Sequence, residues 1–77
     1  PKSGVYGFAR TDEHVCIVTL INAAAENRPI PWANLETWLE GASGVEELQA
    51  NGSLKDIDVR SIEQLKSWEH KVWVVTR

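Results

Sequence analysis

The side chains that could support catalysis or metal binding are few in this 77-residue sequence. His14 and His70 lie far apart, and with a single cysteine the chain offers no paired set of zinc ligands. The adjacent carboxylates Asp12–Glu13 and Glu46–Glu47 diverge in a strand or a tight turn, so we expect them to be solvated rather than to form an acid–base pair. The sequence therefore predicts no catalytic residue, no metal site and no cofactor.

Nucleophilic and phosphate-binding motifs are also not recognisable. Cys16 lies within an apolar run, where we expect a buried and unreactive thiol, because a reactive cysteine needs an exposed, electropositive setting. The spacing of the five glycines matches neither of the two glycine-rich nucleotide-binding patterns, G-x-G-x-x-G and G-x-x-x-x-G-K-S/T. No serine or cysteine stands in a known nucleophile motif. These observations favour a protein that binds rather than one that catalyses.

Aromatic side chains are the remaining candidates for function. An exposed indole stacks on the C–H faces of a sugar or on an apolar partner, although most tryptophans of a small domain belong to its core. Of the four tryptophans, Trp32 stands beside two prolines and is expected to be the most exposed. Trp38 and Trp68 are expected to be intermediate, and Trp73 to be packed. We therefore nominate Trp32 as a ligand-binding residue, with Tyr6 and Trp38 as further candidates.

Composition limits the class of protein. The length predicts one small domain over residues 1–77, and 43% hydrophobic residues are enough for a core. The net charge is −3 and the sequence contains no cluster of basic residues, which argues against a nucleic-acid partner. No apolar run reaches the roughly 20 residues of a membrane-spanning helix, and no signal peptide or lipidation motif is recognisable. The sequence indicates no compartment.

The core is expected to form around the run His14–Asn22, which is rich in β-branched residues. Both faces of this strand are apolar, which predicts an inner strand covered on both sides, with Ile17 and Val18 buried on opposite faces. Gly4–Thr11 predicts a preceding strand joined by a tight turn, and Lys71–Arg77 predicts a closing strand.

The segments in between are more varied. Glu26–Trp32 contains two prolines and predicts an edge strand or an extended connector. Asn51-Gly52 predicts a two-residue hairpin turn with positive φ at both positions, between strands over Val45–Ala50 and Ser53–Val59.

Two segments are undecided between strand and short helix. Residues 34–40 place apolar side chains at helical spacing behind Asn34, and residues 61–69 begin with Ser61 and Gln64 in the pattern of a capping box. We predict a mainly β fold, a small antiparallel β-sandwich or sheet with short helices at 34–40 and 61–69. The alternative is an α+β fold in which both helices pack on an antiparallel sheet.

Several motifs follow one another in an order that resembles a known domain. They are the aromatic-x-aromatic-x-Arg strand Val5–Arg10, the strand Val15–Leu20 that closes on Asn22, Trp38–Gly41 followed by Val45–Ala50, the hairpin Asn51–Leu54, and the closing strand Val72–Val75. Together they resemble the C-terminal β-sandwich domain that follows the catalytic barrel in the α-amylase superfamily of glycoside hydrolases. In that family a short proline-containing turn usually precedes the last strand, whereas here Ser61–His70 intervenes.

The resemblance implies a non-catalytic accessory domain. In the family this domain packs on the barrel and stabilises it, and the catalytic carboxylates belong to the barrel, so no residue here matches them. The expected partner is a catalytic domain or another protein surface, with weak oligosaccharide binding through an exposed indole. The alternative is a free-standing α+β module that acts by protein–protein contact as a dimer.

Overall fold

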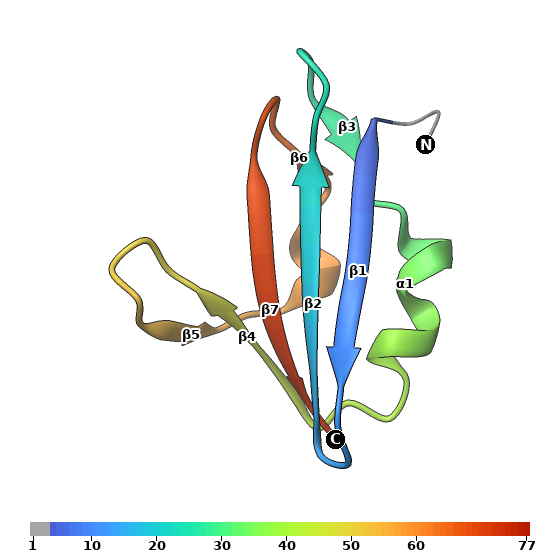
Figure 1. The fold of residues 1–77 in the computed structure, drawn as a ribbon, viewed down its shortest axis with the longest axis vertical. Coiled ribbons are helices and arrows are strands. Elements are labelled where there is room, and N and C mark those ends of the chain that lie inside the picture. The colour runs from blue at the N-terminus through green and yellow to red at the C-terminus, as the bar shows by residue number, and fades with distance from the viewer. Residues whose placement is uncertain (1–3) are drawn as a thin grey trace.

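The computed structural model describes residues 4–77 as a mainly β fold, which confirms the predicted fold class (Figure 1). Five strands form an antiparallel sheet in the order β1-β2-β7-β4-β5, and β3 pairs with β6 in a separate two-stranded ladder. The elements are β1 (Val5–Thr11), β2 (Val15–Asn22), β3 (Arg28–Pro29), the helix α1 (Trp32–Leu39), β4 (Gly44–Leu48), β5 (Leu54–Asp56), the 3₁₀ helix η1 (Val59–Ser61), β6 (Gln64–Leu65) and β7 (His70–Thr76).

The hairpin of β1 and β2 forms as predicted, and its turn is held by one carboxylate. Asp12 accepts hydrogen bonds from the backbone N–H of His14 at 2.8 Å and of Val15 at 2.9 Å. These bonds hold the pKa of the Asp12 carboxyl below its usual value. The turn therefore gains stability that is present above the ordinary pKa of an aspartate and is lost as the pH falls through the lowered one.

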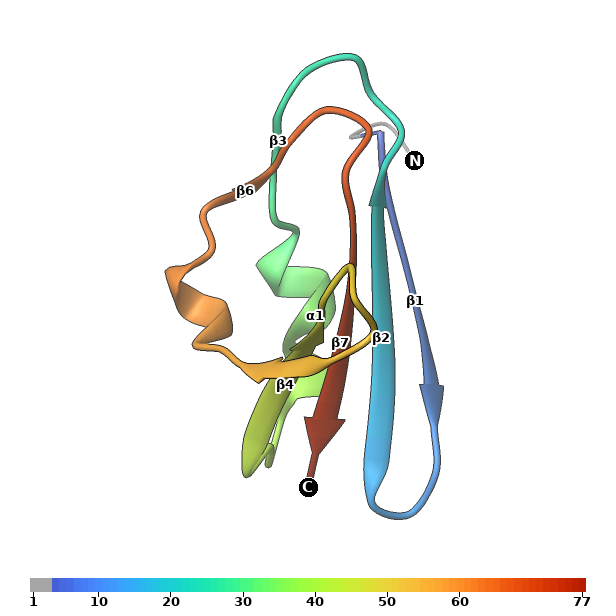
Figure 2. The same cartoon turned by 90° about the vertical axis from the view of Figure 1, so that its left-hand side faces the viewer.

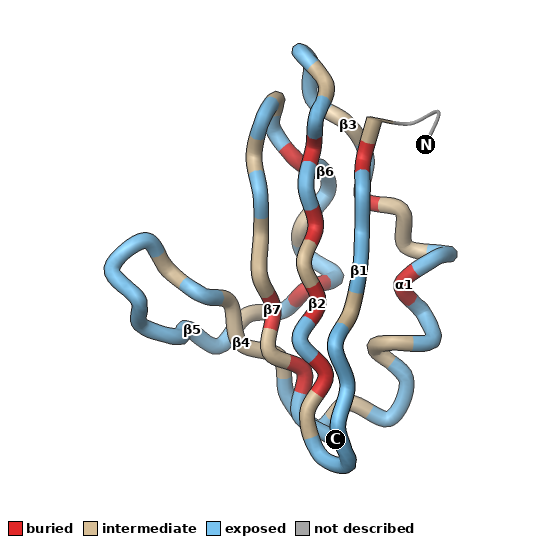
Figure 3. The backbone as a smooth tube through the Cα atoms, viewed as in Figure 1, coloured by how far each residue is buried: buried red, intermediate tan, exposed pale blue. Residues whose placement is uncertain are grey.

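β2 is an inner strand between β1 and β7, but only one of its faces is covered. Cys16, Val18 and Leu20 are buried, while Ile17 is 41% and Ile21 37% exposed. The prediction that Ile17 is buried is therefore wrong. Figure 2 shows the reason, because α1, β3, β6 and η1 all lie on the same side of β2 and β7. The alternation of buried and exposed positions is visible along β2 in Figure 3.

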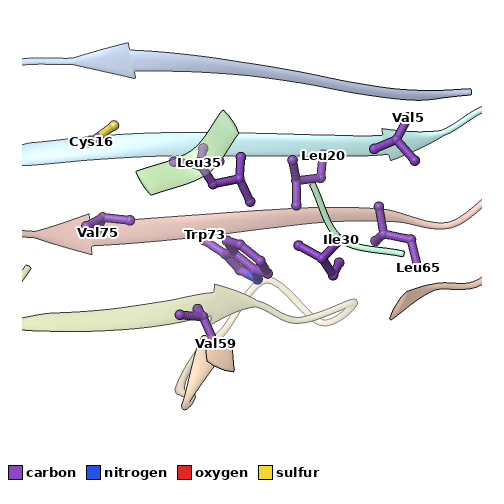
Figure 4. Close-up of a cluster of buried hydrophobic side chains, with 10 residues drawn as sticks. Val5, Cys16, Leu20, Ile30, Leu35, Val59, Leu65, Trp73 and Val75 are labelled. Carbon is purple, nitrogen blue, oxygen red and sulfur yellow. The ribbon is translucent and has the colours of Figure 1, made fainter. Parts of the chain in front are cut away.

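The core lies between the sheet and this single covering layer (Figure 4). Helix α1 contributes Leu35 to the core, and β6 contributes Leu65. Ile30 directly follows β3, and the sheet contributes Trp73 with its neighbours. The buried hydrophobic residues are Val5, Cys16, Val18, Leu20, Ile30, Leu35, Val59, Leu65, Trp73 and Val75. One apolar layer on one sheet face is enough to bury a core in a chain of this length.

The short helix expected over residues 34–40 is present, but it begins earlier. Helix α1 starts at Trp32, behind Pro31, and no side chain caps it, so Asn34 is not the N-cap. Proline is tolerated at this end of a helix because the first N–H groups have no intrahelical partner. Gly41, at φ 73°, follows the helix end as expected.

The second expected helix, over residues 61–69, is wrong. This segment contains the end of η1, the short strand β6 and a turn in which Trp68 has φ 60°. Gln64 pairs with Pro29 in the β3–β6 ladder instead of closing a capping box, and Leu65 is fully buried. Contacts with a distant segment thus outweigh the local helical pattern.

The hairpin at Asn51-Gly52 is confirmed, with a different turn. Only Gly52 has positive φ, at 87°, and the loop is one residue longer than predicted. The backbone N–H of Gly52 donates to Gln49 at 2.9 Å, and that of Gln49 donates to Ser53 at 2.8 Å. A three-residue loop that ends in a left-handed glycine is the next most common hairpin connection.

Gly52→Val is expected to destabilise the protein by about 1–2 kcal/mol, because a β-branched residue is strained at positive φ. No atom lies near the position of an added Cβ, so the cost comes from the backbone rather than from a clash. Ala50→Val, at an exposed position of the same loop, is the matched control and should change stability little. Urea unfolding of both variants measures the difference, and equal midpoints would contradict the turn geometry.

Candidate functional site

A hollow of about 410 Å³ lies between the edge strand β1 and helix α1. The two elements run side by side at one edge of the sheet (Figure 1). We call this hollow the aromatic groove; it is lined by Val5, Tyr6, Gly7, Phe8, Pro31, Asn34, Leu35 and Trp38. Its volume is within the range of small-molecule sites in proteins.

Gly7 lets the helix side of the groove approach the strand closely. A Cβ at this position would lie 3.1 Å from Cδ2 of Leu20 and 3.7 Å from Cζ3 of Trp38. The indole of Trp38 therefore sits next to the bare backbone of β1, and it is half-buried against the core. A glycine within a strand often marks such a close approach.

The groove combines aromatic surface with one amide. Trp38 supplies an indole from the helix side. Tyr6 and Phe8, 47% and 56% exposed, line the groove beside Gly7, but their side chains belong to the other face of the sheet. Aromatic faces stack on apolar C–H surfaces, while the side chain of Asn34 can both donate and accept hydrogen bonds. This arrangement suits a ligand with apolar faces and hydroxyl groups, such as a sugar ring.

Two of the three nominated aromatic residues, Tyr6 and Trp38, line the same hollow, but the side chain of Tyr6 belongs to the other face of the sheet. The third nominated residue lies elsewhere. Trp32 is half-buried at the start of α1, so the expectation that it is the most exposed indole is wrong. Its ring stacks on that of Trp73 with centroids 6.2 Å apart and planes 11° from parallel. The guanidinium of Arg60 lies 5.3 Å from the Trp32 centroid, which leaves this indole between two neighbours.

The other two tryptophans are the most exposed and the most buried of the four. Trp68 is 67% exposed in the turn before β7, whereas Trp73 is fully buried, as predicted. Nε1 of Trp73 donates to Oε2 of Glu47 at 3.0 Å. Oε1 of the same carboxylate lies 3.6 Å from Nζ of Lys71. Glu47 thus satisfies a buried indole rather than pairing with Glu46.

No group of three or more potential metal ligands lies together in the part of the chain that the structure describes, residues 4–77. His14 is exposed at the β1–β2 turn, with Nε2 3.8 Å from the Glu13 carboxylate. Over the same residues, no helix is long and apolar enough to cross a membrane.

A second surface was missed by the sequence interpretation. The uncovered side of the sheet faces the viewer in Figure 1. The strand register arranges its side chains in three rows that combine apolar and aromatic residues with polar and charged ones. We call it the open sheet face; its rows are Tyr6–Ile21–His70, Phe8–Thr19–Val72 and Arg10–Ile17–Val74–Glu46. The strict alternation of β1 gave the signal, since Tyr6 and Phe8 share a face with Arg10.

Comparison of the chain with protein-family models, with curated proteins and with solved structures finds no match.

Proposed function

We propose that the chain is a non-catalytic accessory β domain of an α-glucan-acting glycoside hydrolase, and that it holds a glucan chain in the aromatic groove. The observation that carries the proposal is the hollow in which the indole of Trp38 and the amide of Asn34 lie along the backbone of β1. The resemblance to the C-terminal domain of the α-amylase superfamily supports the choice of an α-glucan and of a catalytic domain as partner.

The groove can bind a sugar without performing chemistry on it. Its lining contains no carboxylate, and glycoside hydrolysis generally needs a pair of them across the scissile bond. Binding would use ring stacking on one or two glucose units and a hydrogen bond to Asn34. Few contacts in an open groove imply weak affinity, with dissociation in the millimolar range.

Isothermal titration with maltoheptaose tests this proposal. We expect weak binding by the parent chain and no release of reducing sugar. Asn34→Ala should lower the affinity several-fold, since Asn34 lines the groove and is exposed, so its loss should leave the fold intact. Trp68→Ala, an exposed aromatic outside the groove, is the control and should bind like the parent.

Two results would remove the sugar-binding role. One is the absence of any heat of binding up to millimolar maltoheptaose with the fold intact. The other is an equal effect of Asn34→Ala and Trp68→Ala.

A free-standing module that acts by protein–protein contact is the second candidate. The open sheet face supports it, because Tyr6, Phe8, Ile17 and Ile21 all rank among the exposed large apolar side chains. A contiguous apolar face of this kind on a soluble domain commonly marks an interaction surface. The structure differs from the predicted form of this candidate, since only one of its two helices is present.

A further inference from the structure

One row of the open sheet face has opposite charges at its two ends. Across β1, β2, β7 and β4 the row reads Arg10, Ile17, Val74, Glu46. Two apolar residues thus separate a cation from an anion. Three strand spacings place the two charged positions about 14 Å apart, too far for an ion pair within one molecule.

Both charges lack an ionic partner among residues 4–77. The ion pairs of this part of the chain involve other residues, and neither Arg10 nor Glu46 takes part in one. A hollow of about 270 Å³ lies next to Arg10 and is also lined by Val15 and Ile17 of the same face. The row therefore offers a cation, an anion and a space for an incoming side chain.

We propose that the open sheet face binds a second copy of this chain, face to face, about a two-fold axis parallel to the strands. Rotation about such an axis leaves each residue at the same position along the strand direction and exchanges the two edges of the face. It therefore sets Arg10 of one copy against Glu46 of the other, and Ile17 against Val74. After this rotation each charged residue of the row faces a residue of opposite charge in the other copy, and each apolar residue faces an apolar one.

The size of the face indicates the strength of the dimer. Four strands about 4.8 Å apart, each contributing about five residues, give a patch on the order of 300–500 Å² per copy. Two such patches remain below the roughly 1,200 Å² at which specific, stable interfaces begin. The dimer is expected to be weak and reversible, with a dissociation constant of tens of micromolar or higher. Aligned packing of two sheets about 10 Å apart is a common arrangement that the open face allows.

Charge exchange tests the pairing directly. Sedimentation equilibrium from about 1 µM to about 1 mM should show a monomer–dimer equilibrium for the parent chain. Arg10→Glu or Glu46→Arg alone should weaken it at least tenfold, because the two-fold axis makes each change act at two contacts. The double variant should regain self-association, and so should an equimolar mixture of the two single variants.

A matched pair of variants tests the apolar centre of the row. Ile17→Lys should abolish dimerisation, whereas Trp68→Lys, an exposed apolar-to-lysine change outside the face, should not. Neither Arg10, Glu46 nor Ile17 lines the aromatic groove, so maltoheptaose binding by the monomer should stay unchanged. Circular dichroism checks that each variant remains folded.

Three outcomes would overturn the proposal. The parent chain could remain monomeric to about 1 mM, including the case in which only a separate catalytic domain covers the face. The double variant and the mixture could both fail to restore what the single charge reversals remove. Ile17→Lys and Trp68→Lys could have equal effects. A failure of maltoheptaose to bind bears on the groove alone and leaves the dimer untouched.

Discussion

Asn22→Asp is expected to destabilise the protein on the order of 3–5 kcal/mol at neutral pH. Asn22 is the one fully buried polar residue in the described part of the chain, residues 4–77. Its side-chain amide Nδ2 donates to the backbone carbonyls of Glu26 at 3.0 Å, Leu65 at 3.1 Å and Lys66 at 2.9 Å. Its Oδ1 accepts from the N–H of Ala24 at 2.9 Å.

The substitution places a carboxylate oxygen against three carbonyl oxygens. Two bonded hydrogens are lost, and a buried negative charge gains no compensating donor. These contacts join the end of β2 to the segment before β7, so the loops at that end of the sheet should loosen first. A small domain has a total stability of only about 5–15 kcal/mol, so this loss is a large share of it.

Asn51→Asp is the matched control. The same chemical change takes place at an exposed hairpin residue whose Oδ1 accepts from the N–H and hydroxyl of Ser53, a role that a carboxylate keeps. Its effect should remain within about 0.5 kcal/mol. Urea unfolding of the two variants measures the contrast, and similar midpoints would show that the Asn22 network contributes little.

The pH dependence of Asn22→Asp gives a second measure. Burial next to carbonyl oxygens should raise the folded-state pKa of the introduced carboxyl above its unfolded value. The folded state then binds more protons between the two pKa values, and its stability relative to the parent falls as the pH rises through that window. The destabilisation should therefore be smaller near pH 4 than near pH 7.

Strands with a regular pattern could be read from the sequence, because local pattern and final environment agree there. Val72 and Val74 alternate with Trp73 and Val75, and the structure buries the second pair completely. The segment over residues 61–69 could not be read in this way. Leu65 is buried in the core because β6 pairs with the distant strand β3, and no property of its sequence neighbours predicts that partner.

The candidate site was predictable in part. Tyr6 and Trp38 were nominated for their aromatic chemistry, but the hollow that both residues line depends on α1 lying along β1, which the sequence left undecided. Trp32 was misjudged because two adjacent prolines suggested an exposed connector. Its burial comes from Trp73 and Arg60, both far along the chain.

The open sheet face was missed for a different reason. Apolar residues on both faces of His14–Asn22 indicate which side chains avoid water, and they do not indicate what covers them. In the structure a layer of α1, β3, β6 and η1 covers the face of β2 that carries Val18, whereas the face that carries Ile17 is uncovered (Figure 2). A strand with two apolar faces thus fits either a fully buried position or a surface that a partner covers.

Val18→Ala and Ile17→Ala should therefore differ strongly, although the residues are neighbours on one strand. Val18 is 1% exposed and pairs with Trp73, so its truncation should cost about 2–4 kcal/mol through lost burial and a residual cavity. Ile17 is 41% exposed, so its truncation should cost about 1 kcal/mol or less, most of it from the lower strand preference of alanine.

Thermal unfolding at low micromolar concentration, where the chain is monomeric under the proposed equilibrium, measures this contrast. Equal costs for the two variants would contradict the one-sided covering of β2. Repeating the measurement near millimolar concentration adds a further test, because a ligand that binds only the folded state stabilises it by mass action. If the second copy covers Ile17, the parent should gain stability with concentration while Ile17→Ala gains less. Val18→Ala should gain as much as the parent, since Val18 faces away from the interface.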